Sequence, residues 1–293
     1  MQTEQPTNGS PLSTRQRKSQ AAQRKWIRLL CRVADDWRAQ GRYAEAEPLY
    51  RRALALAEPA CGGEEVATIC NNLAVLYKYM GRLDEAEPLY RRALVLLEQS
   101  GGPEHPEIAT LYHNLGGLEH ARGRFADGEP LARRAVEIRE RALGPDHPEV
   151  AADITALAAI LDGQGRYDES EPLYRRALAI FEREYGPEHY EIAVNLNNLA
   201  ANCHAQGRNE EAERFYRRAF AIKVKLLGAE HPDVAVTANN LAVFFKSQQK
   251  YEAAMRLYRY ALDIFEKALG PKHPKVVVCR GNYAKMLGKM NRG

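Results

Sequence analysis

The chain has 293 residues, of which 45% are hydrophobic and 27% are charged, as in an ordinary globular protein. This balance excludes a wholly disordered chain, and no apolar run approaches the roughly 18 residues that a membrane-spanning helix needs. The net charge is +4. Most of the excess lies in residues 1–30, so the rest of the chain is nearly neutral, which argues against a nucleic-acid-binding surface.

The first 20 residues are polar and lack the apolar stretch of a secretory signal. We expect them to form a disordered, basic N-terminal arm. The chain contains five cysteines, an odd number, with no pair at zinc-ligand spacing. This cysteine usage is typical of a reducing compartment and predicts a cytoplasmic protein.

A repeating pattern follows the arm. The dipeptide Gly-Arg recurs at residues 41, 81, 123, 165 and 207, and a block close to Gly-Pro-x-His-Pro starts at residues 102, 144, 186, 228 and 270. Self-similarity at a fixed period is typical of repeat proteins, in which neighbouring units stack to bury a continuous core. The spacing of about 42 residues predicts six copies.

Each copy is predicted to contain two helices. In residues 148–163, apolar side chains recur at three- and four-residue steps, as on one face of a helix. Gly165 provides a turn, and a second helix is expected from about Tyr167 to Glu184. A last helix over 275–290 has no partner helix and is expected to cap the open end of the core.

Four prolines lie within the second helices, about five residues after the turn. We expect them to fall among the first four N–H groups of the helix, which have no intrahelical partner, and so to remove no hydrogen bond. They are Pro48, Pro88, Pro130 and Pro172.

Residues 71–94 carry a set of small and apolar side chains at Leu73, Ala74, Tyr77, Gly81, Ala86, Tyr90 and Ala93. This pattern resembles the tetratricopeptide repeat (TPR), and the 42-residue period with its His-Pro loop resembles the kinesin light chain subclass of that family. The resemblance covers residues from about 26 to 293. It implies an all-α, right-handed α-solenoid of stacked antiparallel helix pairs, with about 13 helices. We therefore expect an arm over 1–20 and a single solenoid over 21–293.

One histidine per loop could suggest a metal site. Packed helices lie roughly 8–10 Å apart, so loop histidines of neighbouring copies should be too far apart to share an ion. Capping or fixing of the loop before proline is the favoured interpretation. These histidines are His105, His147, His189, His231 and His273.

Five copies contain an Arg-Arg pair in the second helix, at residues 51–52, 91–92, 133–134, 175–176 and 217–218. The first arginine follows a glutamate by four residues, the favourable order for an ion pair on an exposed helix. A solvated outer face is therefore favoured over a phosphate-binding ridge. No P-loop, G-x-S-x-G, H-E-x-x-H or Gly-rich dinucleotide motif is present, so we predict a non-catalytic protein without cofactor or metal.

Asparagines recur in the middle of the first helix of most copies, although asparagine is only a modest helix former. In the resembled family this helix lines a concave groove, where asparagines contact bound peptide. The alternative is a hydrogen bond between repeats that fixes their stacking, and one side chain could serve both purposes. The candidate peptide-binding residues are Asn71, Asn72, Lys78, His113, Asn114, His120, Asn197, Asn198, His204, Asn239, Asn240, Lys246 and Asn282.

The fourth copy lacks the asparagines and has Thr155, Ala156 and Asp162 instead. This break suggests either two half-grooves or a ligand side chain that enters at the centre. The first hypothesis is a scaffold that binds an extended, acidic or C-terminal peptide segment, selected in part by Lys78 and Lys246. The alternative is a self-assembling module that forms homo-oligomers. We expect neither nucleic acid nor membrane as a partner.

Overall fold

The computed structural model describes residues 14–102 and 105–290, and this part of the chain contains thirteen α-helices and no β-strand. The helices are α1 (Thr14–Ala39), α2 (Tyr43–Ala57), α3 (Gly63–Tyr79), α4 (Leu83–Gly101), α5 (Pro106–Ala121), α6 (Phe125–Leu143), α7 (Pro148–Gly163), α8 (Tyr167–Tyr185), α9 (Tyr190–Ala205), α10 (Asn209–Leu227), α11 (Pro232–Ser247), α12 (Tyr251–Leu269) and α13 (Pro274–Met290). None of the helices in these ranges is long and apolar enough to span a membrane.

Six helix pairs and a last helix follow the chain, as the period predicts. The all-α solenoid is thereby confirmed, and the expected bounds of α7 and α8 are correct to within one residue. The first helix starts at Thr14, inside the segment that we expected to be an arm. The remainder of that segment, residues 1–13, lies outside the described residues.

The Gly-Arg markers lie at the turns between the two helices of each pair. Gly165 has a φ of +77°, in the left-handed region that glycine adopts without strain. Its N–H bonds the carbonyl of Asp162, and the next N–H bonds that of Leu161, which satisfies the last carbonyls of α7. In the sixth pair the position is taken by Gln249, with a φ of 59°.

The expectation for the four helix prolines is wrong. In α2 the N–H of Ala46 already bonds the carbonyl of Arg42, so the hydrogen-bonded part of the helix begins two residues before Pro48. The same offset holds for Pro88, Pro130 and Pro172. These prolines therefore interrupt the helical hydrogen bonding early in the helix, because each lacks the N–H that the fourth preceding carbonyl would accept.

The apolar core divides into two large parts along the solenoid. One buried cluster runs from Ile27 to Ile138 and the other from Val150 to Met286. A small cluster of Ala132, Leu157, Ile160 and Leu161 lies between them. In each large cluster, fully buried tyrosines from the second helices pack against buried alanines, which let the paired helices approach closely.

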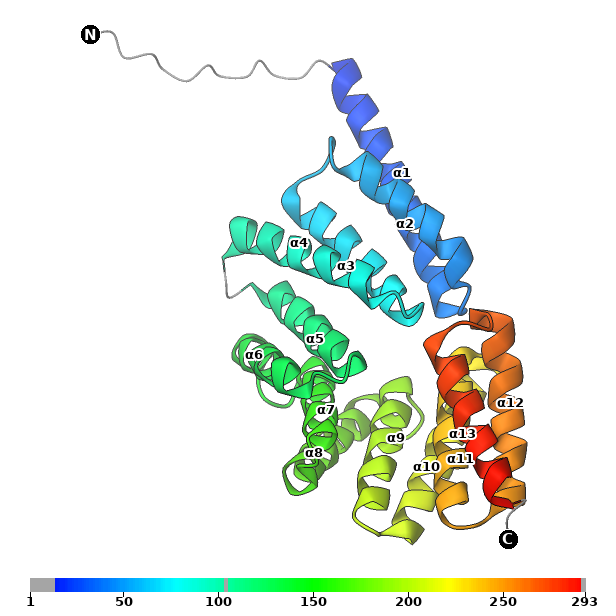
Figure 1. Ribbon diagram of the computed structural model, residues 1–293. Helices are drawn as coiled ribbons and strands as arrows, with labels where there is room; N and C mark the ends of the chain where they lie inside the picture. Colours follow the sequence, from blue (N-terminus) through cyan, green and yellow to red (C-terminus); the bar gives the residue numbers. More distant parts are fainter. Residues whose placement is uncertain (1–13, 103–104, 291–293) are drawn as a thin grey trace.

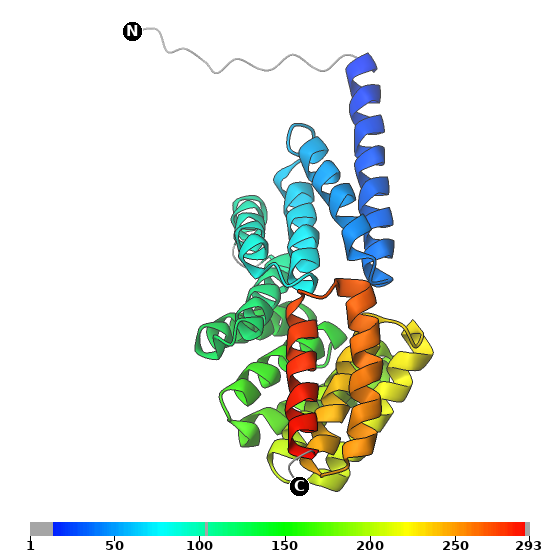
Figure 2. The same cartoon turned by 45° about the vertical axis from the view of Figure 1, so that its right-hand side comes forward.

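The helix pairs follow a curve, with the odd-numbered helices on the inner side and the even-numbered helices on the outer side (Figure 1). The curve closes on itself: the turn ends of α1–α2 and α3–α4 lie beside the loops that precede α11 and α13, and both views show these regions together (Figures 1 and 2). The odd-numbered helices therefore present a strongly concave inner face.

Candidate functional site

The predicted asparagines make hydrogen bonds between neighbouring helix pairs. Asn114 of α5 donates to the side-chain oxygen of Asn71 in α3, at 2.8 Å. Asn240 of α11 donates in the same way to Asn197 of α9, at 3.3 Å. Both contacts join residues 43 apart in the sequence, so they recur with the repeat. These four side chains thus form the hydrogen bonds between repeats that the stacking interpretation requires.

The two central junctions carry the same kind of contact with other side chains. His113 of α5 bonds Asp153 of α7 through its Nδ1, at 2.8 Å. Asn195 of α9 donates to the hydroxyl of Thr155 in α7, at 2.9 Å. Each junction from α3 to α11 therefore has at least one polar contact between the middle parts of the first helices. We refer to these four contacts, 71–114, 113–153, 155–195 and 197–240, as the inner bridges.

The bridge between α5 and α7 is the most heavily charged. The Nε of Arg139 donates to Asp153 at 2.6 Å, and both residues are buried, with exposed fractions of 6% and 2%. The same guanidinium also pairs with Glu149 and donates to the hydroxyl of Thr110 at 3.0 Å. Asp153 thereby holds the imidazole of His113 in one orientation, with its ring still partly exposed.

Sequence reasoning missed Arg139 and Asp153 as members of this site. One repeat earlier, the equivalent positions hold Leu97 and Leu111. The sequence therefore carried a signal: in this repeat a charged pair replaces two apolar residues at core positions. Such a replacement indicates a buried polar contact.

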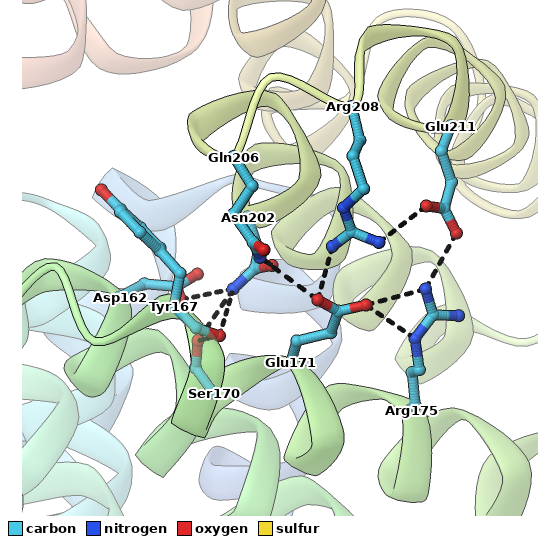
Figure 3. Close-up of polar contacts among 9 residues, drawn as sticks. All are labelled: Asp162, Tyr167, Ser170, Glu171, Arg175, Asn202, Gln206, Arg208 and Glu211. Carbon is cyan, nitrogen blue, oxygen red and sulfur yellow. Dashed lines mark hydrogen bonds and ion pairs between the residues drawn. The ribbon is translucent and has the colours of Figure 1, made fainter.

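Asp162, one of the residues that break the asparagine pattern, takes part in packing. Its carboxylate accepts hydrogen bonds from Ser170, from the hydroxyl of Tyr174 at 3.1 Å and from Asn202 at 2.9 Å. Figure 3 shows Asn202 reaching from α9 toward Asp162 and Ser170. Burial raises the pKa of Asp162, while these three donors lower it. The break in the fourth copy thus serves a polar packing contact between α7, α8 and α9.

The other candidate residues differ in how much of their polar surface remains available. Asn72 and Asn198 are partly exposed, and among the described residues their side chains only accept from the asparagine before them, each at 3.4 Å. The buried side-chain oxygen of Asn239 has no hydrogen-bond partner in the part of the chain that the structure describes, while its nitrogen donates to Asn240 at 3.4 Å. Asn282 is partly exposed on α13. These side chains keep unused donors or acceptors next to the bridges.

The two remaining histidines occupy equivalent places on α5 and α9. His120 is exposed and packs against the ring edge of Phe125 at 5.3 Å between centroids. His204 packs in the same manner against Phe244 at 5.2 Å, and its Nε2 bonds the hydroxyl of Ser247 at 2.8 Å. Burial lowers the pKa of His204. Burial also lowers the pKa of His120, and the charge of Lys78 adds to the effect, so the neutral form is favoured in both rings.

Lys78 is the most distinctive cation of the inner face. Its ammonium lies beside Gly117 of α5: a Cβ at this glycine would approach the Nζ to 3.2 Å. Within the described residues the Nζ has no hydrogen bond and no carboxylate partner. Burial lowers the pKa of Lys78 to about 8, and the charge of Lys275 adds to the effect. Lys246, at the equivalent place on α11, is likewise partly buried and without an ion pair in the described residues.

A small hollow lies next to Asn71. It has a volume of about 210 Å³, and its lining comes from α3, α4 and α5. It is lined by Ala67, Thr68, Asn71, Leu97, Glu107, Thr110 and Leu111. Its walls combine apolar side chains with one amide, two hydroxyls and the carboxylate of Glu107.

On the outer face the first arginine of each Arg-Arg pair forms an ion pair with the glutamate four residues earlier, as predicted. Arg175 pairs with Glu171 four residues earlier, at 2.8 Å, and Glu171 also binds Arg208 of the next copy and accepts from Gln206 (Figure 3). The other four copies repeat both ion pairs of this glutamate. One is with the arginine four residues later in α2, α4, α6 or α10, and the other is with an arginine or lysine near the turn of the next copy. The outer face is thus a ladder of ion pairs, and the arginine of the Gly-Arg marker is part of it in most copies.

The five loop histidines cap the helices that follow them, as predicted. In each, Nδ1 accepts the backbone N–H two residues later, at 3.1–3.4 Å. Within the described residues, no group of three or more histidine, cysteine or acidic side chains is arranged to hold a metal ion. The histidines therefore have a structural explanation that needs no metal.

A family model described as tetratricopeptide repeat matches the chain over residues 27–99, 65–127, 107–168, 152–225, 191–267 and 233–292. No curated protein matches the sequence.

Among solved structures, BtubC (BKLC) from P. vanneervenii is 24% identical, with a TM-score of 0.54 over 86% of this chain and 94% of that chain. A putative kinesin light chain from Podosopora anserina is also 24% identical, with a TM-score of 0.52 over 70% of this chain and 96% of that chain. A Rap protein complexed with competence and sporulation factor is 13% identical, with a TM-score of 0.62 over 89% of this chain and 87% of that chain. At these identities the likeness concerns the fold.

Proposed function

The chain belongs to the tetratricopeptide repeat family, and we propose that it is a non-catalytic scaffold that binds an extended protein segment along its concave inner face. The observation that carries this proposal is the row of amide and amine groups on the inner helices whose bonding capacity is only partly used. Asn72, Asn198 and Asn282 flank the inner bridges, and Lys78 stands among them without a counter-ion in the described residues. A Rap protein of similar fold was solved with a bound factor, which supports an interaction role.

The charge of the inner face favours an acidic segment. Lys78 lies deep on that face, and burial lowers its pKa to about 8. The charged form of the amine is therefore destabilised as long as it has no anionic partner. A carboxylate of the ligand would relieve this penalty and restore the charged form. Lys246 offers the same group on the opposite half of the curve. We therefore expect a preference for acidic side chains or a free C-terminus.

A labelled pool of acidic peptides with free C-termini tests this proposal by fluorescence anisotropy. Because a charge-assisted hydrogen bond contributes about 1.5–3 kcal/mol, Lys78→Ala should weaken binding by at least roughly tenfold. The matched control is Lys267→Ala, which removes the same charge from the outer helix α12, where Lys267 pairs with Asp263. Equal affinities for the two variants and the wild type would contradict an acidic ligand on the inner face.

Self-assembly is the second candidate, and one surface favours it. Val277 and Val278 on α13 are 56% and 58% exposed. The equivalent of Val277 one repeat earlier, Ala235, is fully buried. A second copy that covers α13 would bury these valines. Light scattering over a range of concentrations, with Val277→Lys as comparison, decides the point: a monomer at every concentration excludes this candidate.

A further inference from the structure

Two contacts close the solenoid into one superhelical turn. The Nε2 of His231 lies 2.9 Å from the carbonyl oxygen of Ala39, and the Nε2 of His273 lies 3.0 Å from that of Tyr79. These partners are 192 and 194 residues apart in the sequence. The loops ahead of α11 and α13 thereby rest on the turns of the first and second helix pairs (Figures 1 and 2). We call these two contacts the seam.

The backbone of the turns fits the prolines that follow the two histidines. A Cβ added at Gly41 would lie 2.9 Å from the Cδ of Pro232, and one added at Gly81 would lie 2.9 Å from the Cδ of Pro274. Gly207 belongs to an Ala-Gln-Gly-Arg turn identical to that of Gly41 and has nearly the same φ, yet a Cβ there would meet nothing within 4 Å. The close approach is therefore a property of the seam and not of the turn.

The hydrogen bonds of both seam histidines fix the tautomer. Nδ1 of His231 accepts the N–H of Asp233, and Nδ1 of His273 accepts that of Lys275, each at 3.1 Å. Since Nδ1 is an acceptor, the single proton of the neutral ring resides on Nε2 and is donated across the seam. A protonated ring carries a hydrogen on both nitrogens, so it keeps the Nε2–H donor but can no longer accept the N–H at Nδ1, and the cap of the loop is lost.

The charges around the two rings differ. His231 shares a cleft with Asp36 of α1 and with Glu230, and Asp233 beside it accepts from Tyr190 of α9 at 2.7 Å. The ammonium of Lys223, from α10, lies 3.5 Å from the carbonyl of Asp233.

His273 faces Tyr79 of α3 and its own neighbours Lys272 and Lys275, with Lys78 of α3 close to Lys275. Burial lowers the pKa of His273, the bond to Tyr79 opposes this, and the charge of Lys275 adds to the lowering. A histidine pKa lowered by folding means that its contribution is fully present above the unfolded pKa of about 6.5 and is lost as the pH falls through the folded pKa.

We propose that the seam is a histidine latch: the hydrogen bonds of His231 and His273 hold the turn closed, and protonation of His273, which removes the cap of its loop, releases the turn, so that the curvature of the inner face responds to pH. The latch is a property of the chain alone. Its effect on access of a partner rests on the proposed function, because an opened turn would widen the face on which the partner lies.

The distance between spin labels at Gln40 and Glu230, two exposed residues of the cleft beside the seam, reports the state of the latch without any ligand. In a background with Cys31 and Cys61 replaced by serine, the wild type should show one short distance at about pH 8 and a growing long-distance population as the pH falls from about 6.5 toward 5. Far-ultraviolet circular dichroism on the same samples confirms that the helices persist. A short distance at every pH with intact helices would overturn the proposal.

Asparagine variants separate the seam bond from the helix cap. Asparagine caps helices well but is too short to reach the opposite carbonyl, so His231→Asn/His273→Asn keeps both caps and loses both seam bonds. Each lost bond should shift the equilibrium toward the open form by about fivefold, and the remaining opening should no longer depend on pH. His147→Asn, a cap outside the seam, should behave as the wild type.

A steric variant gives an independent answer. Gly41→Ala should open the turn at neutral pH, whereas Gly207→Ala carries the same backbone strain without the contact to proline. If both alanine variants stay closed, or if the double asparagine variant keeps the short distance of the wild type, the latch does not exist. Peptide binding is measured separately, so failure of the binding proposal would leave this result unaffected.

Discussion

Between α5 and α7 the inner bridge joins an imidazole to a buried carboxylate that also holds Arg139, whereas between α9 and α11 it joins two neutral amides. The charged bridge lies where the two large apolar clusters meet, and the amide bridge lies inside one of them. A polar contact with buried charges must be complete to be tolerated, because each member loses its hydration. An amide has two N–H donors and an oxygen with two lone pairs, so an amide bridge uses only part of the bonding capacity of its two members.

For the proposed binding role, this difference separates the centre of the inner face from its two ends. At the centre, the hydrogen bonds between neighbouring helices occupy the polar groups of Asp153, Arg139 and Thr155. The unused amide groups lie to either side, around Asn72 near the start of the curve and around Asn198 near its end. Of the two explanations for the break in the fourth copy, these contacts favour two half-grooves over a ligand side chain at the centre.

The largest effect is expected at the charged bridge. Asp153→Leu leaves the buried guanidinium of Arg139 with Glu149 as its remaining charged partner and should lower the free energy of unfolding by about 3 kcal/mol, measured by urea denaturation. The double variant Arg139→Leu/Asp153→Leu copies Leu97 and Leu111 of the preceding repeat and should recover most of this loss. A single variant as stable as the double one would show that the bridge is not a coupled unit.

The copies differ in how far their sequence predicts them. The helix bounds could be predicted from the positions of the glycines and the His-Pro pairs, because left-handed turns and N-caps need those residues locally. The charged bridge could be predicted only by comparing Asp153 with Leu111, the residue at the equivalent position one repeat earlier. The seam could not be predicted, because it depends on small rotations between repeats that accumulate over about 190 residues.

The next effect concerns the outer side of the junction between the fourth and fifth pairs. Glu171 accepts from Arg175, Arg208 and Gln206, so Glu171→Ala should lower the free energy of unfolding by about 1.5 kcal/mol. Glu210 is exposed on α10 and has no ion pair in the described residues, so Glu210→Ala is the matched control and should change stability by less than about 0.5 kcal/mol. If the two variants lose the same stability, the ladder of ion pairs does not contribute to stacking.

The amide bridge should be less sensitive than either charged contact. Asn240→Ala removes the bond to Asn197 and should lower the free energy of unfolding by about 1 kcal/mol, a typical value for a neutral hydrogen bond. Thermal denaturation of this variant beside Asp153→Leu tests the comparison directly. A loss at Asn240 as large as that at Asp153 would mean that the amide bridge carries the same coupling as the charged one.

The smallest effect on stability belongs to Asn198, and it tests the half-groove most sharply. Asn198 neighbours the bridge, but within the described part of the chain its side chain makes no hydrogen bond between helix pairs and bonds only Asn197, at 3.4 Å. Asn198→Ala should therefore change the free energy of unfolding by less than about 0.5 kcal/mol. The same substitution removes an amide that could bond the backbone of an extended ligand, so the affinity for the acidic peptide pool should fall about fivefold. Asn240→Ala, by contrast, should weaken binding only together with stability. Unchanged binding in Asn198→Ala would assign this asparagine to stacking alone, because its unused donor and acceptor groups would then serve no ligand.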